Sequence, residues 1–247
     1  MEIDKVTQDK VQSFVKGLTK ADDTEIKGYI SEIVADKKLD DSLAKMTNFP
    51  SGEKPFSYRI AVDMASRMAL YVLSRAMKPA IVVETGVGSG TSSSYILRAL
   101  DKNAKGKLFS IDVPWYTVTH NWKKAWENTD PKPQPVEMQS GWIIPDYLRD
   151  RWELTMGMSN EKLPPLLQKL GTIDIFFHDS EHSYENMSWE FKTAWPNLKK
   201  KGVLLVHNVD KTKAFSEFEQ SVGGTSFRVS GLNNDSQMML IGGKVKE

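Results

Sequence analysis

The chain of 247 residues contains no cysteine. Disulfide bonds, thiolate metal sites and cysteine nucleophiles are therefore excluded. The sequence also has no run of about 18 apolar residues, which is the length that a membrane-spanning helix needs. Its first residues, Met-Glu-Ile-Asp-Lys, lack the apolar stretch of a signal peptide. From these absences we expect a cytoplasmic protein that does not bind membranes.

An excess of charge of one sign is also missing. The 33 Lys and Arg residues nearly balance the 32 Asp and Glu residues, so the formal net charge is +1. Such a balance gives no basic field to attract nucleic acid, and we expect none as a partner. With 40% hydrophobic residues, the chain is long enough to bury one sizeable core.

The N-terminal part differs in pattern from the rest. Residues 1–48 are polar and helical in pattern, with apolar side chains at helical spacing between Ile26 and Val34. Residues 50–55 read Pro-Ser-Gly-Glu-Lys-Pro, which is typical of a linker. We therefore predict an N-terminal helical cap with its linker over residues 1–55 and a main domain over residues 56–247.

Strands and helices alternate after the linker. This alternation predicts an α/β fold with a mostly parallel, seven-stranded sheet and helices on both of its faces. The last two strands read as a hairpin that adds one antiparallel edge strand. The expected helices are 57–77, 91–101, 163–170, 185–198 and 214–221, and the expected strands are 81–84, 107–112, 152–156, 173–177, 202–206, 225–229 and 237–241.

One long segment, residues 113–151, interrupts the alternation. It is rich in tryptophan, tyrosine and proline, and it includes Trp142 and Tyr147. A connection of this length is usually a functional lid or the wall of a binding site. A packed irregular excursion is the other interpretation, and the sequence leaves both open.

Residues 82–90, Val-Val-Glu-Thr-Gly-Val-Gly-Ser-Gly, are the most informative stretch. They predict a buried strand that ends in an acid, then a glycine turn, then a helix that begins at Thr91. Glycine lets the backbone turn sharply and lets a ligand approach it closely, and the free N–H groups of the helix start bind carboxylate or phosphate. The fixed charge of Glu84 favours a cationic or hydroxyl-rich ligand over a pyrophosphate. A tight turn without a ligand is the alternative.

A second acid follows at a strand–helix–strand interval. Asp112 ends the expected strand 107–112. An acid in that position accepts hydrogen bonds from ribose hydroxyl groups. By itself it would be an ordinary loop aspartate, but together with the glycine turn it indicates a nucleoside site.

Three of the four histidines lie close together in the sequence. His178-Asp179-Ser180-Glu181-His182 follows the expected fourth strand, and His207-Asn208-Val209-Asp210 follows the fifth. Ligands of such sheets bind beyond the carboxyl ends of the strands, so both groups should face the same crevice as the glycine turn. His178 follows two apolar phenylalanines and is expected to be a buried structural histidine.

These motifs resemble class I S-adenosylmethionine-dependent methyltransferases. More narrowly, the chain is similar to small-molecule O-methyltransferases related to catechol O-methyltransferase and to the macrolide-sugar O-methyltransferases. The resemblance covers about residues 57–220 and implies a Rossmann-like fold. It rests on Glu84–Gly90, Asp112, the segment Ile173–Tyr184 with its Asp-x-x-His-x-Tyr element, and Gly202–Asn208.

The resemblance also implies roles for individual residues. Asp179 would bind a divalent cation and take part in catalysis, and His182 would be the base that removes the acceptor proton. The fifth-strand pair, His207 and Asn208, would supply the other metal ligands. The residues implied to hold S-adenosylmethionine are Glu84, Thr85, Gly86, Gly88, Gly90, Thr91, Ser92, Asp112 and Asp179.

The fifth-strand pair departs from the family pattern, which is Asp-Asp or Asp-Asn. Because Mg²⁺ prefers oxygen ligands over imidazole, three interpretations remain open. Asp179 and Asn208 could hold a weakly bound Mg²⁺, an imidazole from His207 could favour Zn²⁺, Fe²⁺ or an ion like Mn²⁺, or no metal could bind and His207 would only form hydrogen bonds.

The resemblance thus predicts transfer of a methyl group from S-adenosylmethionine to a hydroxyl group of a small molecule or sugar. A nicotinamide-dependent oxidoreductase is the first alternative, although Thr91 stands where a dinucleotide fingerprint has its third glycine. A cofactor-binding module without catalytic activity is the second. A homodimer is a possible assembly, with Met64 and Met68 as candidate interface residues.

Overall fold

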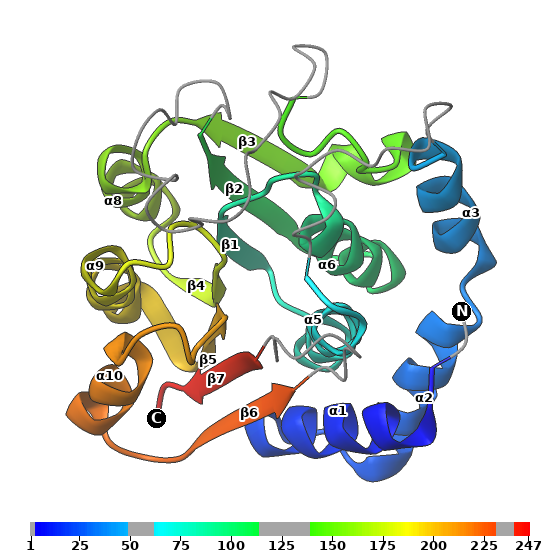
Figure 1. Cartoon of the computed structure of the whole chain (residues 1–247), viewed down its shortest axis with the longest axis horizontal. Coiled ribbons are helices and arrows are strands. Elements are labelled where there is room, and N and C mark those ends of the chain that lie inside the picture. The colour runs from blue at the N-terminus through cyan, green and yellow to red at the C-terminus, as the bar shows by residue number, and fades with distance from the viewer. Residues whose placement is uncertain (1–2, 49–61, 114–138, 231–239) are drawn as a thin grey trace.

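The short apolar runs of the sequence form a single seven-stranded sheet. The computed structural model describes residues 3–48, 62–113, 139–230 and 240–247. Its strands are β1 (Ile81–Thr85), β2 (Lys107–Asp112), β3 (Trp152–Met156), β4 (Ile173–His178), β5 (Leu198–His207), β6 (Ser226–Ser230) and β7 (Leu240–Val245). They lie in the order β3-β2-β1-β4-β5-β7-β6 (Figure 1). All run in one direction except β7, which is antiparallel to both of its neighbours, so the predicted Rossmann-like sheet is confirmed.

The place of the antiparallel strand differs from the prediction. The sequence predicted an antiparallel strand at the edge, but β7 lies between β5 and β6, and β6 is the edge strand. The burial of the two strands explains this order. Residues 241–244 of β7 are buried, whereas β6 buries only Val229. The strand with the more buried residues takes the inner position because both of its faces are covered there.

Helices cover both faces of the sheet (Figure 1). Helices α8, α9 and α10 pack on one face, and α5 and α6, with the N-terminal α1 and α2, pack on the other. Short 3₁₀ helices precede β3 and β5. The bounds are α1 (Lys5–Leu18), α2 (Asp23–Val34), α3 (Lys37–Met46), α5 (Met64–Met77), α6 (Thr91–Lys102), η2 (Asp146–Arg151), α8 (Ser159–Leu170), α9 (Tyr184–Ala194), η3 (Trp195–Asn197) and α10 (Ala214–Val222).

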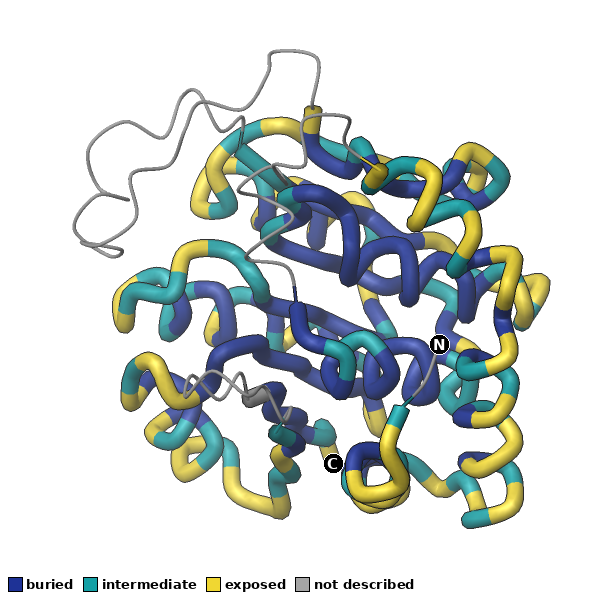
Figure 2. The backbone as a smooth tube through the Cα atoms, turned by 45° about the vertical axis from the view of Figure 1, so that its right-hand side comes forward, coloured by how far each residue is buried: buried dark blue, intermediate teal, exposed yellow. Residues whose placement is uncertain are grey.

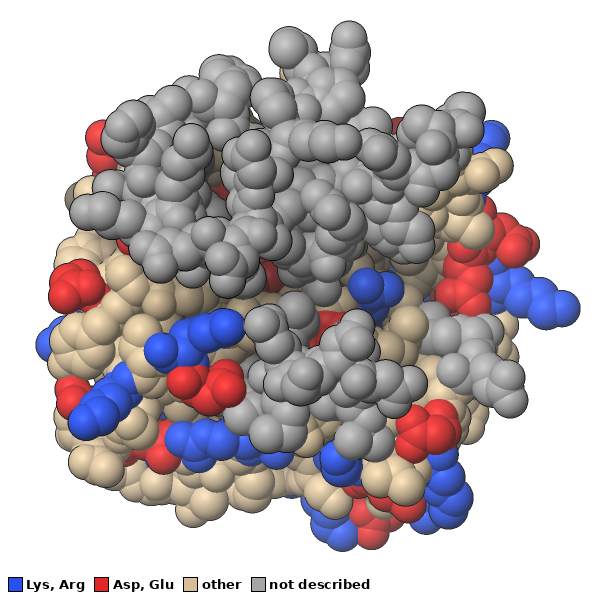
Figure 3. Space-filling view, viewed as in Figure 1, with Lys and Arg blue, Asp and Glu red and all other residues tan. Residues whose placement is uncertain are grey.

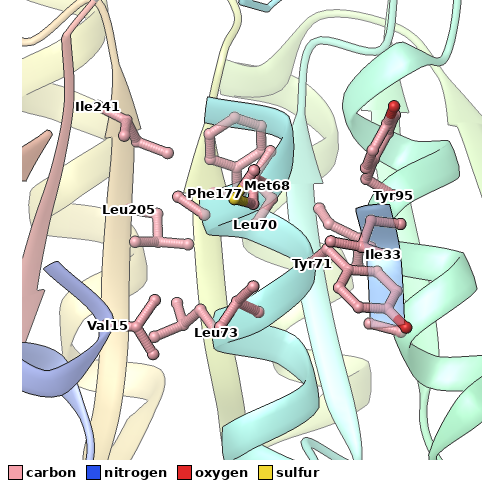
Figure 4. Close-up of a cluster of buried hydrophobic side chains, with 14 of the residues drawn as sticks. Val15, Ile33, Met68, Leu70, Tyr71, Leu73, Tyr95, Phe177, Leu205 and Ile241 are labelled. Carbon is pink, nitrogen blue, oxygen red and sulfur yellow. The ribbon is translucent and has the colours of Figure 1, made fainter. Parts of the chain in front are cut away.

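Each face of the sheet has its own hydrophobic core. Successive strand residues point to opposite faces, so Phe177 and Leu205 belong to the core under α5, whereas Phe176 and Leu204 belong to the core under α9. Figure 4 shows Phe177 and Leu205 in the first of these cores, and Figure 2 shows buried, dark-blue strands in the middle of the molecule. The sheet is therefore a rigid platform for whatever lies at the ends of its strands.

The predicted N-terminal cap packs into the hydrophobic core under α5. Val15 of α1 and Ile33 of α2 lie in the same cluster as Leu205 of the sheet (Figure 4). A buried ion pair joins Arg98 of α6 to Asp36, which caps α3, with 2.6 Å between Nε and Oδ2. The predicted linker and the boundary at residue 55 lie outside the described residues, so the division into two parts stays a prediction.

The end of helix α9 was predicted too far along the chain. Helix α9 ends at Ala194 instead of residue 198, and Leu198 already begins β5. Pro196 explains the early end, because proline has no N–H to continue the helix. Helix α8 begins at Ser159, four residues before the predicted start at 163.

Helix α5 begins at Met64 instead of the predicted residue 57, since residues 62–63 are not helical. The aromatic segment is only partly within the described residues. Asp63 caps α5 by accepting hydrogen bonds from the N–H groups of Ala65 and Ser66. Residues 57–61 and 114–138 lie outside the described residues, so the lid and excursion interpretations of the aromatic segment stay predictions. Met68 is 1% exposed in the core, so its predicted place in a dimer interface is wrong.

Two predictions from composition can be compared with the structure: a surface of mixed charge and the lack of a membrane-spanning helix. On the face shown in Figure 3, acidic and basic side chains of the described residues are interspersed. No helix among the described residues has the length and apolar character needed to cross a bilayer.

Candidate functional site

The predicted site residues gather at the carboxyl ends of β1, β2, β4 and β5. The glycine turn, Gly86–Gly90, follows β1, and its three glycines have positive φ angles of 83°, 54° and 93° at Gly86, Gly88 and Gly90. A Cβ on Gly86 would lie 2.1 Å from the carbonyl oxygen of Asp179. Glycine is thus required at position 86, because the turn packs directly against the backbone that follows β4.

Glu84 lies beneath the turn and is fully buried. Its two carboxylate oxygens accept hydrogen bonds from the hydroxyl groups of Ser92, Ser93 and Ser110, at 2.7, 2.7 and 2.8 Å. Burial raises the pKa of Glu84 to about 7, although the three hydroxyl groups oppose this shift. Its predicted contact with the methionine part of the cofactor stays a prediction.

Other predicted hydroxyl groups of the turn are bound within the protein. The hydroxyl group of Thr85 donates to Glu190, and that of Thr91 shares a hydrogen bond with Ser89. Helix α6 begins after Gly90 without a side-chain cap. The backbone N–H groups of its first turn are therefore the groups of this segment best suited to bind a carboxylate.

Asp112 lies beside the glycine turn, as the sequence predicted. The N–H of Gly88 donates to its Oδ2 at 3.1 Å, and burial raises the pKa of this carboxyl group. Residues 139–144 also pair with the turn, since the N–H groups of Gly141 and Ile143 donate to the carbonyl oxygens of Gly88 and Ser89. Sequence analysis did not predict this contact, because only the folded chain brings residues 139–144 next to the turn.

A histidine cluster lies next to the turn and consists of Asp179, His182 and His207. One donor atom from each of these residues lies within 4.8 Å of the others. Nδ1 of His207 is 2.7 Å from Oδ1 of Asp179, and Nε2 of His182 is 3.8 Å from the same oxygen. The structure thus brings together the residues that sequence analysis assigned to catalysis and to metal binding.

The two imidazoles of the cluster differ in their environments. Burial by itself would lower the pKa of His207, but the charge and the hydrogen bond of Asp179 outweigh burial and raise that pKa. For His182, burial and the neighbouring His178 and His207 lower the pKa to about 3. His182 is therefore neutral near pH 7, and its Nε2 has no hydrogen-bond partner among the described residues.

Asn208, the other predicted metal ligand, follows directly after the cluster. It is 5% exposed and has a left-handed backbone with a φ angle of 53°. Its carbonyl oxygen accepts a hydrogen bond from the N–H of Lys211. The residue is thus held by a tight turn at the end of β5.

His178 is buried, as expected, but its partner was not predicted. Nδ1 of His178 lies 2.7 Å from Oε2 of Glu190, a fully buried residue of α9. Burial by itself would raise the pKa of Glu190, yet the charge and the hydrogen bond of His178 hold it below its usual value. In the sequence Glu190 looks like an ordinary helix charge, since only its position on the inner face of α9 reveals its burial.

Comparisons with known proteins agree with this geometry. The sequence matches the family described as "Methyltransferase domain" over residues 83–209, which is just over half of the chain. No curated protein matches the sequence.

Solved structures share the fold at low sequence identity. Cofactor-bound Rv0187 from MTB has a TM-score of 0.59 and 18% identity, with 88% of this chain and 94% of that chain covered. An O-methyltransferase from Bacillus cereus in complex with S-adenosylhomocysteine has a TM-score of 0.56 and 14% identity, with 94% and 100% covered. TomG, an O-methyltransferase from Streptomyces achromogenes involved in tomaymycin synthesis and solved with S-adenosylmethionine, has a TM-score of 0.54 and 17% identity, with 86% and 91% covered.

The match covers the glycine turn, Asp112 and the histidine cluster, and the structural similarity extends over most of the chain. The chain therefore belongs to the methyltransferase-domain family and has the fold of S-adenosylmethionine-dependent O-methyltransferases, as the sequence motifs predicted.

Proposed function

We propose that the chain transfers the methyl group of S-adenosylmethionine to a hydroxyl group of a small molecule or sugar. The observation that carries this proposal is the contact between the glycine turn and the start of the histidine cluster. The N–H of Asp179 donates to the carbonyl oxygen of Thr85 at 2.8 Å, and Gly86 packs against Asp179. A methyl donor on the turn would thus lie beside groups that can accept a proton.

The residues of the turn suit the proposed cofactor. Its carboxylate would bind at the first N–H groups of α6, and Asp112 would accept hydrogen bonds from the ribose hydroxyl groups. The buried acid Glu84 lies beneath the turn and favours a ligand with positive charge. S-adenosylmethionine, which carries a sulfonium and an ammonium group, supplies the methyl group.

His182 is the proposed proton acceptor. Its imidazole is neutral near pH 7, and its Nε2 has no hydrogen-bond partner in the part of the chain that the structure describes. Asp179, which lies between His182 and His207, would orient the acceptor side of the site. Positioning of the acceptor oxygen in line with the methyl group then supplies much of the rate enhancement.

A divalent cation is a further part of the proposal, with Asp179, His207 and Asn208 as the residues that would hold it. The donor chemistry of the cluster fits ions that accept imidazole, such as Zn²⁺, Fe²⁺ or Mn²⁺, better than it fits Mg²⁺. Such an ion would lower the pKa of an acceptor hydroxyl group. Metal analysis of the purified protein and its melting temperature with and without a strong chelator test this part. Absence of bound metal together with an unchanged melting temperature in chelator would contradict it.

Calorimetric titration with S-adenosylhomocysteine tests the cofactor site. We expect saturable binding to the wild-type chain and weaker binding by at least tenfold to Gly88→Val, because a β-branched residue at a φ of 54° is strained by about 1–3 kcal/mol. The matched control is Val87→Ala, which leaves all three glycines of the turn in place. Absence of binding to the wild type would contradict the proposal.

Transfer of a tritiated methyl group to a panel of catechols, phenols and sugars tests the reaction. Cofactor binding without turnover across the panel would favour a binding module instead. Binding and oxidation of a nicotinamide cofactor would favour an oxidoreductase. A small-molecule acceptor, a cytoplasmic location and a homodimer are included in the proposal, and sedimentation of the purified chain tests the last of these.

A further inference from the structure

Glu190 has no role in the function proposed above, yet it occupies the centre of a buried network. Its carboxylate is fully buried. The hydroxyl groups of Thr85 and Ser180 donate to it at 2.6 and 2.7 Å, Nδ1 of His178 at 2.7 Å, and the amide of Asn186 at 3.3 Å. Four donors on one carboxylate satisfy a charge that would otherwise be very costly to bury.

The donors come from both halves of the proposed site. Thr85 is the last residue before the glycine turn, and Ser180 directly follows Asp179 in the segment that leads to His182. Asn186 also donates to the hydroxyl group of Ser180, at 3.0 Å, and to the carbonyl oxygen of Glu181, at 2.9 Å. Glu190 therefore contacts the cofactor side directly and the catalytic side both directly and through Asn186.

We propose that Glu190 is a positioning residue that fixes the glycine turn and the segment 179–183 relative to one another. The inference rests on the proposed function, since it gives Glu190 the task of placing the methyl donor at a set distance from the histidine cluster. A small error in this distance lowers the rate of methyl transfer strongly, because the reacting atoms must be aligned before the methyl group moves.

A carboxylate suits this task better than an amide. Its two oxygens accept several hydrogen bonds at once, whereas glutamine has only one acceptor oxygen and turns an N–H₂ group toward the hydroxyl groups or His178. Glu190→Gln keeps the shape of the side chain and removes this set of acceptors. Glu185→Gln is the matched control, because Glu185 is exposed in the first turn of the same helix.

Two measurements on the purified, folded variants test the inference. The first is calorimetric titration with S-adenosylhomocysteine, for which we expect Glu190→Gln to bind roughly threefold to tenfold more weakly than the wild type. The second is ¹⁵N NMR of the histidine side chains, in which we expect Nδ1 of His178 to be the protonated nitrogen in the wild type, because this atom faces the carboxylate of Glu190. We expect Glu190→Gln to change this tautomer and to shift the signals of His182 and His207. Glu185→Gln should change neither measurement.

A purely structural role gives a different result. In that case Glu190→Gln would lower the melting temperature, but well below this temperature its affinity for S-adenosylhomocysteine and the signals of His182 and His207 would equal those of the wild type. That result would overturn the inference. If the wild type itself does not bind S-adenosylhomocysteine, the proposed function fails, and the NMR signals still decide whether Glu190 positions the histidine cluster.

Single-contact variants keep the test open if Glu190→Gln does not fold. Thr85→Val removes the contact on the cofactor side and should weaken binding of S-adenosylhomocysteine. Ser180→Ala removes the contact on the other side and should mainly shift the His182 signals. If the network acts as a unit, the effects of the two changes will not add in the double variant. If the effects of Thr85→Val and Ser180→Ala add in both measurements, Glu190 does not couple the two sides.

Discussion

Two fully buried glutamates at the same edge of the sheet have opposite electrostatic properties. Glu84, beneath the glycine turn, accepts hydrogen bonds from three serine hydroxyl groups, and burial raises its pKa to about 7. Glu190, beside the histidine cluster, has hydroxyl donors too, but His178 holds its pKa below the usual value. Neutral donors thus fail to offset the loss of water around a carboxylate, whereas a nearby imidazole does offset it.

This difference separates the two halves of the site. On the turn side, an acid can gain a proton near neutral pH, so a positively charged ligand would favour its ionised form. On the histidine side, each carboxylate has an imidazole beside it: His178 lies 2.7 Å from Glu190, and His207 lies 2.7 Å from Asp179. The proposed function assigns cofactor binding to the turn side and uptake of the acceptor proton to the histidine side.

The largest effect should come from the histidine side. We expect His182→Ala to lower turnover by about 10²–10⁴-fold, because a positioned base contributes that much, and to leave the affinity for S-adenosylhomocysteine nearly unchanged. Turnover and melting temperature measured on the same preparation check this. If His182 only braces its segment, the variant will melt at a lower temperature and keep most of its turnover.

The pH dependence of stability should separate the two glutamates. The folded pKa of Glu84 lies above its ordinary value of 4.5, so its contribution to stability is fully present below pH 4.5 and is lost as the pH rises toward about 7. We expect Glu84→Gln to remove this loss, which amounts to on the order of 3 kcal/mol in the free energy of unfolding. Urea unfolding of the wild type and of Glu84→Gln between pH 4.5 and 8 measures this difference.

The same unfolding experiment should give the opposite pH dependence for Glu190. Its folded pKa is lowered, so its contribution to stability is present above its ordinary pKa and is lost as the pH falls through the folded value. Glu190→Gln should therefore cost stability at neutral pH, where Glu84→Gln gains it. If both variants changed the free energy of unfolding in the same direction at pH 8, the proposed difference between the two glutamates would be contradicted.

The contact between the two halves can be broken at Gly86. We expect Gly86→Ala to cost about 1–3 kcal/mol of stability, because alanine would be strained at a φ of 83° and its Cβ would meet the carbonyl oxygen of Asp179. Gly28→Ala in α2 is the control, since a Cβ there meets no atom within 4 Å, and it should stabilise the helix by roughly 0.5–1 kcal/mol. Equal effects of the two changes in thermal unfolding would argue against the packed contact.

The smallest effect is expected at Asp112. Asp112→Asn should weaken binding of S-adenosylhomocysteine by about threefold to tenfold, because the carboxylate proposed to accept hydrogen bonds from the ribose loses its charge. The exposed Asp150 provides the control, Asp150→Asn, which should bind as the wild type does. Calorimetric titration of both variants makes the comparison.

Local pattern was enough to predict most of the sheet and the position of the site. The alternation of apolar strands and helices predicted seven strands, and the glycine turn, Asp112 and the two histidine segments all follow strands that end at one edge. Parallel strands necessarily bring their carboxyl ends together, so a sequence with polar residues after each strand already places them side by side. The family could be predicted for the same reason.

Tertiary structure alone decided which partner each buried group has. The sequence contains Glu84 and Glu190 as two similar acids, but burial and neighbours distant in the chain give one a raised pKa and the other a lowered one. Likewise, strand β7 takes an inner place in the sheet because its residues are buried on both faces, which local alternation does not reveal. The sequence by itself determined the elements and the edge where the chemistry gathers, whereas desolvation and long-range hydrogen bonds, which exist only in the folded chain, determined the charges there.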